Sequence, residues 1–236
     1  MVRRALVAGG SGLVGSALVR ILAGDAAYNS VTCLARRPAA EAGKVATQVV
    51  DFEALESTTL AAVDDAFCCL GTTRKKAGSD EAFRRVDLDY VVAFARAARN
   101  AGASRFFLVS SLGADAESRM LYPRVKGEAE AVVQGLGFRA VVIARPSVLD
   151  GDRAEDRPGE AAALVVGRVV APLLFGPLRK YRPIAAEAVA RALVVLAHAE
   201  VQGTRIVLSD ELAELARQTE GNPALAGGAA PGSPAR

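Results

Sequence analysis

Tryptophan is absent from this chain, aromatic residues make up only 5% of it, and histidine occurs once. So few aromatic side chains provide no platform on which nucleic-acid bases could stack. The net charge is only +3, and the basic residues are scattered rather than gathered in a patch. The composition therefore predicts no nucleic-acid partner.

Cysteine is also scarce. The three copies, Cys33, Cys68 and Cys69, cannot all form pairs with one another, and the sequence contains no CxxC or Cys/His spacing. We therefore expect no metal site. Because each cysteine lies in an apolar run, the pattern indicates small buried thiols in a reducing cytoplasm.

Long apolar segments are few. The first ten residues, MVRRALVAGG, contain no apolar stretch and cleavage site of the kind found in a signal peptide. The longest apolar segment, 161–178, contains Arg168 at its centre and Pro172, and both argue against a membrane span. We expect a cytoplasmic protein with no integral membrane segment.

Short apolar runs alternate with helical stretches, which is typical of βα units in a parallel sheet. Strands are expected at 2–8, 30–35, 46–50, 64–70, 104–109, 139–145 and 204–208. Helices are expected at 13–23, within 53–62, and at 80–101, 118–135, 159–175 and 185–198. The sequence thus predicts an α/β fold with a Rossmann-like, doubly wound parallel sheet of about seven strands.

A glycine-rich loop follows the first expected strand. It reads Gly9-Gly10-Ser11-Gly12-Leu13-Val14-Gly15, a GxxGxxG pattern at the point where the strand should turn into a helix. Glycine permits the turn, a close approach to a pyrophosphate and tight packing of helix on strand. The helix N-terminus then offers N–H groups to phosphates. These residues predict a dinucleotide site.

The second expected strand ends before Arg36 and Arg37, where an NAD site usually has an acidic residue that accepts from the ribose 2′-hydroxyl. Two guanidiniums suit a 2′-phosphate instead, and we expect NADP(H) to be preferred over NAD(H). The alternative is a solvated basic pair at a strand end.

Two further strand ends should face the same crevice, because ligands of such sheets bind at the carboxyl ends of the strands. Asp51 is expected to accept from the adenine amino group while Phe52 covers the ring. The segment Leu70-Gly71-Thr72 is expected to pass close to the ribose and the pyrophosphate, since Gly71 has no side chain.

The fifth expected strand ends in Ser110-Ser111, and Tyr122 and Lys126 follow in the sequence YPRVK. The i, i+4 spacing places the phenol and the ammonium on one face of a helix. A nearby ammonium favours the phenolate, so the Tyr122 side chain becomes a usable acid or base. A serine hydroxyl could then stabilise the oxyanion that forms as hydride arrives at a carbonyl.

These motifs together resemble the extended or atypical short-chain dehydrogenase/reductase superfamily, and most of all its Tat-interacting oxidoreductase-like family. The resemblance covers about residues 3–198 and is carried by VVDFEAL (49–55), FCCLGTTRKKAGS (67–79), VDLDYV (86–91), SSLGAD (110–115), YPRVKGEAE (122–130) and RPSVLDGDRAEDRPGE (145–160). It implies a Rossmann-like fold, NADPH binding, Tyr122 as proton donor or acceptor and Lys126 on the cofactor ribose. It also implies that Pro146, Ser147 and Val148 lie beside the nicotinamide.

The chain departs from the superfamily pattern at two places. Many members have asparagine early in the fourth helix, where this chain has Val86-Asp87. The catalytic serine could align with Ser110, with Ser111 or with the position of Leu112.

The sequence therefore predicts one NAD(P)-binding domain over residues 1–220, in which 147–200 form a small substrate-capping lobe, and a disordered tail over 221–236. The expected function is NADP(H)-dependent oxidation or reduction of a small alcohol or carbonyl substrate by a monomer or homodimer. Two alternatives stay open: an NADP(H)-binding regulatory or scaffold protein with little catalysis, and a nucleotide-sugar epimerase or dehydratase.

Overall fold

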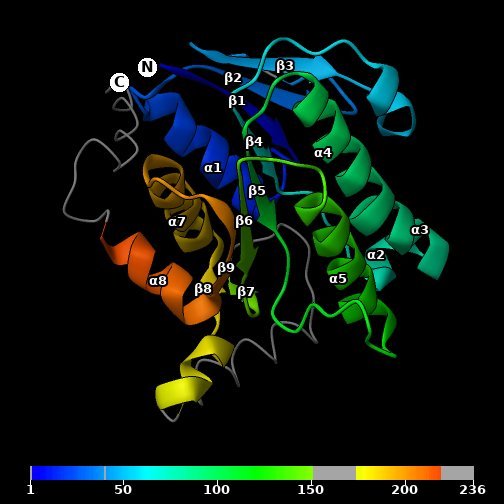
Figure 1. Cartoon of the computed structure of the whole chain (residues 1–236), viewed down its shortest axis with the longest axis vertical. Helices are drawn as coiled ribbons and strands as arrows, with labels where there is room; N and C mark the ends of the chain where they lie inside the picture. The colour runs from blue at the N-terminus through cyan, green and yellow to red at the C-terminus, as the bar shows by residue number, and fades with distance from the viewer. Residues whose placement is uncertain (1, 40, 151–173, 219–236) are drawn as a thin grey trace, which may run out of the picture.

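The computed structural model describes residues 2–39, 41–150 and 174–218. Its main sheet has seven parallel strands in the order β3-β2-β1-β4-β5-β6-β9 (Figure 1). They are β1 (Arg3–Ala8), β2 (Tyr28–Ala35), β3 (Val45–Val49), β4 (Asp65–Cys68), β5 (Arg105–Val109), β6 (Ala140–Arg145) and β9 (Gly203–Leu208). The order reverses between β1 and β4, which is the switch point of a doubly wound sheet. The predicted fold class is confirmed.

Helices cover both faces of this sheet. Helices α1 (Leu13–Gly24), α7 (Ala186–His198) and α8 (Ser209–Arg217) lie on one side in Figure 1. The other side carries η1 (Phe52–Ser57), α3 (Asp80–Arg84), η2 (Arg85–Asp89), α4 (Tyr90–Asn100) and α5 (Leu121–Gln134), with the short α2 (Arg74–Ala77) nearby.

The two layers of helices enclose two hydrophobic clusters, one on each face of the sheet. Alternate residues of β1 show the reason: Ala5 and Val7 belong to the cluster under α1 and α7, whereas Leu6 and Ala8 belong to the cluster under α4 and α5. All four are buried, because both faces of a parallel sheet are covered. Continuous apolar runs therefore predicted the strands correctly.

The expected helix at 80–101 forms as three consecutive pieces rather than one regular α-helix. A π-helical segment, η2, separates α3 from α4 and places Asp87 in the interior, where it is fully buried. Such π turns inside helices often occur at functional sites. Apolar periodicity could not reveal this insertion, since all three pieces continue the same helical direction.

The C-terminal part of the domain differs from the prediction in its boundaries. Residues 186–198 were expected within the substrate lobe, but α7 packs against α1 and contributes Val189 and Leu193 to the core of the main domain. Its apolar face is complementary to the sheet, so the helix belongs to the Rossmann layer. The other described elements of the segment expected to form the lobe are η4 (Gly176–Tyr181) and a small sheet of β7 (Leu149–Asp150) and β8 (Ile184–Ala185).

Some expectations lie outside the described residues. These are residues 159–173 of the expected helix 159–175, most of the apolar segment 161–178 and the tail 221–236. Within the residues that are described, no helix is long and apolar enough to cross a membrane.

Candidate functional site

The glycine-rich loop lies at the switch point, between the carboxyl ends of β1 and β4. Gly9 has a positive φ of 81°, and a Cβ atom there would lie 2.4 Å from the carbonyl oxygen of Cys69. A Cβ on Gly15 would lie 2.1 Å from the carbonyl oxygen of Gly9. Gly12 caps α1 without any side-chain hydrogen bond, so the first turn of the helix can offer its N–H groups to an anion.

We expect Gly15→Ala to weaken NADPH binding at least tenfold, because the new methyl group forces the loop backbone away from its position over the helix. Gly24→Ala is the matched control, since it lies in the same helix and a Cβ there meets no atom within 4 Å. That control should bind NADPH as the wild type does. Isothermal calorimetry measures both variants, and unchanged affinity in Gly15→Ala would contradict the assignment of the loop.

The residues expected to bind the adenosine half lie at the ends of β2 and β3. Arg36 and Arg37 are exposed and make no hydrogen bond or ion pair with another described residue. One oxygen of Asp51 accepts from the backbone N–H of Glu53 at 2.9 Å and caps η1. Asp51 is itself exposed, so its carboxylate can still meet a ligand.

The structure corrects the expectation for the Phe52 ring. Phe52 is only 5% exposed and packs on Tyr90, with ring centroids 5.5 Å apart. A ring in this position belongs to the hydrophobic core and does not cover an adenine. The sequence misled because an aromatic residue next to a strand end can point either into the crevice or under the neighbouring helix.

The loop Leu70-Gly71-Thr72 contacts the expected catalytic lysine. A Cβ on Gly71 would lie 3.5 Å from the Lys126 Nζ atom and 3.4 Å from Asp87 Oδ1. Lys126 Nζ is 2.7 Å from Asp87 Oδ1, and the N–H of Thr72 donates to Asp87 Oδ2 at 2.8 Å. The strand-end loop, the lysine and Asp87 therefore form one buried group beside β4.

Lys126 remains a cation in this environment. Burial lowers its pKa, but the Asp87 carboxylate and the nearby Tyr122 phenol more than offset that effect, and the pKa lies above its ordinary value. Beside it, burial raises the pKa of the Cys68 thiol to about 12, so that group stays neutral. The ammonium expected from the YxxxK spacing is present, but it is paired with a carboxylate that the spacing did not reveal.

The structure distinguishes the two serines that follow β5. Ser110 is buried and its hydroxyl donates to Glu130 Oε1 at 2.5 Å, while Glu130 forms an ion pair with Arg145. The Ser111 hydroxyl oxygen is also shielded from solvent, yet it has no hydrogen-bond partner among the described residues. An unpaired buried hydroxyl is rare and marks a position where a ligand atom could be received.

Helix α5 presents a row of polar side chains at i, i+4 and i+8. Tyr122 lies in the first turn, 39% exposed, with its ring stacked on Phe83 at a centroid distance of 5.5 Å. Lys126 and Glu130 follow it and are buried. Glu130 was not predicted, although its spacing from Tyr122 and Lys126 was the signal that could have found it.

Gly127 explains how α5 comes so close to the loop after β5, and it too was missed. A Cβ there would lie 2.1 Å from the backbone nitrogen of Ala116. The N–H of Asp115 donates to the carbonyl oxygen of Pro123 at 3.0 Å, which joins this loop to the helix start. The position of Tyr122 is therefore fixed by backbone contacts.

The segment after β6 lies against the serine loop. The N–H of Leu112 donates to the carbonyl oxygen of Pro146 at 2.8 Å. The N–H of Ser110 donates to the carbonyl oxygen of Ala144, also at 2.8 Å. Ser147 donates its hydroxyl to the Arg182 carbonyl, whereas Val148 is 47% exposed. Hence the segment from Pro146 to Val148 lies beside the carboxyl ends of β5 and β6, and its place beside a nicotinamide stays a prediction.

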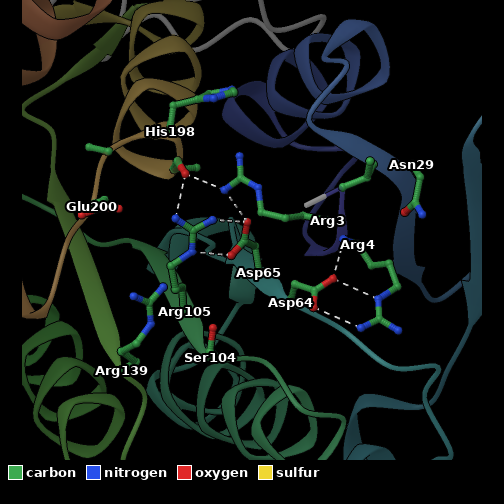
Figure 2. Close-up of a pocket in the computed structure, with 13 residues that line it drawn as sticks. Arg3, Arg4, Asn29, Asp64, Asp65, Ser104, Arg105, Arg139, His198 and Glu200 are labelled. Atoms are coloured by element: carbon green, nitrogen blue, oxygen red, sulfur yellow. Dashed lines mark hydrogen bonds and ion pairs between the residues drawn. The ribbon is translucent and has the colours of Figure 1, made fainter.

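A separate cavity of about 740 Å³ lies at the opposite, amino ends of the strands (Figure 2). Figure 2 shows Arg3 and Arg105 directed at Asp65, and both also donate to the carbonyl oxygen of Ala197 in the last turn of α7. Two guanidiniums thus cap the negative end of a helix dipole and neutralise one buried carboxylate. These inner groups satisfy one another, and we assign the cluster a structural role.

Comparison with known proteins agrees with this geometry. The sequence model of the family described as NAD(P)H-binding matches residues 9–171. Protein HTATIP2 of Rattus norvegicus is 46% identical over 160 residues, which cover 65% of this chain and 66% of that protein. The chain belongs to the NAD(P)H-binding family, as an atypical short-chain dehydrogenase/reductase.

This atypical short-chain dehydrogenase/reductase is also similar to a fungal protein that it matches over nearly the whole length, and to a human protein of known structure. Protein FMP52, mitochondrial, of Eremothecium gossypii is 35% identical over 219 residues, or 91% of this chain and 97% of that protein. The crystal structure of human epimerase family protein SDR39U1 with NADPH superposes with a TM-score of 0.61 at 20% identity, covering 89% of this chain and 77% of that one. The latter likeness concerns the fold.

One prediction is wrong in the light of these relatives. A cytoplasmic location was expected, but several fungal FMP52 proteins similar to this chain are named mitochondrial. Cysteine usage and the lack of a secretory signal pattern were the basis of that expectation, and neither distinguishes one reducing compartment from another.

Proposed function

We propose that this protein is an NADP(H)-dependent oxidoreductase that interconverts a small carbonyl compound and its alcohol. The observation that carries the proposal is the Ser111 hydroxyl, which is shielded from solvent and has no hydrogen-bond partner among the described residues. Ser111 follows β5, and α5 carries Tyr122 and the buried Lys126 ammonium one turn apart. The glycine loop supports the proposal, since Gly9 and Gly15 allow the loop backbone to pack against Cys69 and against the start of α1, the arrangement in which a helix N-terminus can receive a pyrophosphate.

Each side chain has a distinct task in the proposed reaction. A bound nicotinamide would supply or accept the hydride. Ser111 donates a hydrogen bond to the substrate oxygen and stabilises the negative charge that develops there. Tyr122 transfers the proton to or from that oxygen, and Lys126 orients the cofactor ribose. Ser110 acts differently, because its bond to Glu130 fixes the end of β5 and so positions Ser111.

Preference for NADP(H) rests on Arg36 and Arg37. Replacing both by alanine should weaken NADPH binding by roughly tenfold to a hundredfold and leave NADH binding unchanged, because charge-assisted hydrogen bonds to a 2′-phosphate are lost. Arg139→Ala is the control, an exposed arginine at the other end of the sheet. Calorimetry with both cofactors measures the two affinities. Equal losses of affinity for NADH and NADPH would contradict the role of Arg36 and Arg37 in binding a 2′-phosphate.

One observation favours the regulatory alternative. Asp87 compensates the Lys126 charge, which reduces the help that the lysine can give to proton transfer by Tyr122. Calorimetry with NADPH followed by NADPH oxidation across a panel of carbonyls and quinones separates the two functions. Binding with turnover supports the oxidoreductase, binding without turnover on any substrate favours a regulatory protein, and absence of binding overturns both.

A further inference from the structure

Asp87 is a buried carboxylate with two defined contacts. It is 0% exposed, and it comes from η2, the π-helical segment that interrupts the helix between α3 and α4. One oxygen lies 2.7 Å from the Lys126 ammonium, and the other accepts from the Thr72 N–H at 2.8 Å. The carboxylate therefore joins three segments that are distant in the sequence: the loop after β4, the π segment and α5.

The energetics of this group depend on charge as well as shape. A buried ion pair that loses one partner leaves the other charge uncompensated, which is strongly unfavourable. An amide in place of the Asp87 carboxylate could still accept from the Thr72 N–H, but it would bring no negative charge to Lys126. Aspartate and asparagine are nearly equal in shape, so at this position they differ in charge and in the amide NH2 group, which donates where the carboxylate oxygen accepts, and both differences remove the compensation of the ammonium.

We propose that Asp87 is a positioning residue for the oxidoreductase reaction: it keeps Lys126 charged and couples that ammonium to the loop Leu70–Thr72, so that the lysine and the cofactor-binding loop adopt their arrangement together. The proposal rests on the proposed NADP(H)-binding function. It assigns a role to the position where the resembling superfamily often has asparagine. Lysine placement in this chain then depends on a direct ion pair.

The charged and titratable groups that face Lys126 are Asp87 from η2, Tyr122 from α5 and Cys68 from β4. The pKa of Lys126 is raised in the folded protein, so the Lys126–Asp87 ion pair stabilises the fold. This stabilisation is fully present below the pKa of a lysine in the unfolded chain, about 10.4, and is lost as pH rises through the pKa of folded Lys126. In Asp87→Asn the burial effect is unopposed by a carboxylate, so the lysine pKa falls. The stability loss in that variant should be largest near neutral pH and should shrink toward about pH 9.5.

The stability test uses urea unfolding of the full chain at about pH 7 and about pH 9.5. We expect Asp87→Asn to lower the unfolding midpoint at the lower pH and to approach the wild type at the higher one. Combining it with Lys126→Met should restore much of the lost stability, because no unpaired charge then remains. Asp89→Asn, an exposed neighbour in η2, is the control. The ion-pair role would be overturned if Asp87→Asn lost the same stability at both pH values and if the stability losses of the two single variants simply added in the double variant.

The functional test measures NADPH affinity of the same variants by calorimetry. Asp87→Asn should bind NADPH roughly tenfold more weakly, with a further loss at the higher pH, whereas the wild type and Asp89→Asn should change little between the two. If the NADPH affinity of Asp87→Asn changed with pH in parallel with that of the wild type, the coupling to the cofactor loop would be overturned. A wild type that binds no NADPH would instead overturn the proposed function, and the urea series would still decide whether Asp87 holds the lysine charge.

Discussion

Tyr122→Phe should lower the turnover number by about a hundredfold to ten-thousandfold, the range typical of removing a general acid or base. The substitution deletes only the hydroxyl. The ring keeps its stacking on Phe83, and the helix start stays tied to the loop before it through the bond between Asp115 and Pro123. NADPH affinity should therefore stay within about twofold of the wild type, since no cofactor-binding group is displaced.

The measurement is NADPH oxidation at saturating substrate, with cofactor binding followed separately by calorimetry. Tyr90→Phe is the matched control, because the Tyr90 hydroxyl bonds Glu53 on the surface, away from the carboxyl ends of β5 and β6. It should retain wild-type turnover. Equal turnover in Tyr122→Phe and the wild type would remove Tyr122 from the mechanism, whatever the cofactor affinity.

Arg105→Met should destabilise the protein by about 1.5–3 kcal/mol, because a buried carboxylate loses charge-assisted hydrogen bonds while it keeps those from Arg3 and Tyr28. Arg105 is 7% exposed and donates to both oxygens of Asp65, at 2.6 Å and 2.5 Å, and to the Ala197 carbonyl at 2.7 Å. Methionine fills a similar volume but offers no donor. The carboxylate and the end of α7 then lose hydrogen bonds together.

Urea unfolding of the variant and the wild type gives the difference in free energy of unfolding. Arg139→Met, an exposed arginine that lines the same cavity, should change stability by less than about 0.5 kcal/mol. NADPH binding of folded Arg105→Met should be unchanged, because the cavity lies at the amino ends of the strands and the cofactor site at their carboxyl ends. A stable Arg105→Met protein would contradict the structural role of the cluster.

Much of the fold could be predicted because it follows from local patterns in the sequence. Each of the seven expected strands agrees with the structure to within two residues at either end. Continuous apolar runs indicate the central strands, whose two faces are covered, whereas the edge strands β3 and β9 are largely exposed or half-buried. The predictions failed where local signals are weak. Helix α8 and the short strands β7 and β8 were not predicted, and α7 was placed in the lobe rather than in the core.

For the candidate site too, local sequence patterns indicated some residues, and others depend on contacts with a different element. The glycine loop, Tyr122 and Lys126 could be proposed as site residues from the sequence, because the chemistry expected of them depends on spacing within one loop or one helical turn. Phe52 was misjudged, Glu130 and Gly127 were missed, and the choice between Ser110 and Ser111 stayed open. In each case the deciding neighbour belongs to a different element, as Glu130 does for Ser110.

The sequence by itself determined the parallel sheet and indicated the residues proposed for its carboxyl edge, because burial patterns and glycine requirements act over a few neighbouring residues. Only the tertiary structure decided how those residues are charged and paired. A π turn brings Asp87 to Lys126, and α5 brings Glu130 to Ser110, through contacts between elements whose approach depends on packing across the whole sheet. Electrostatic partners that are far apart in the sequence are brought together by three-dimensional packing, and no local sequence pattern indicates them.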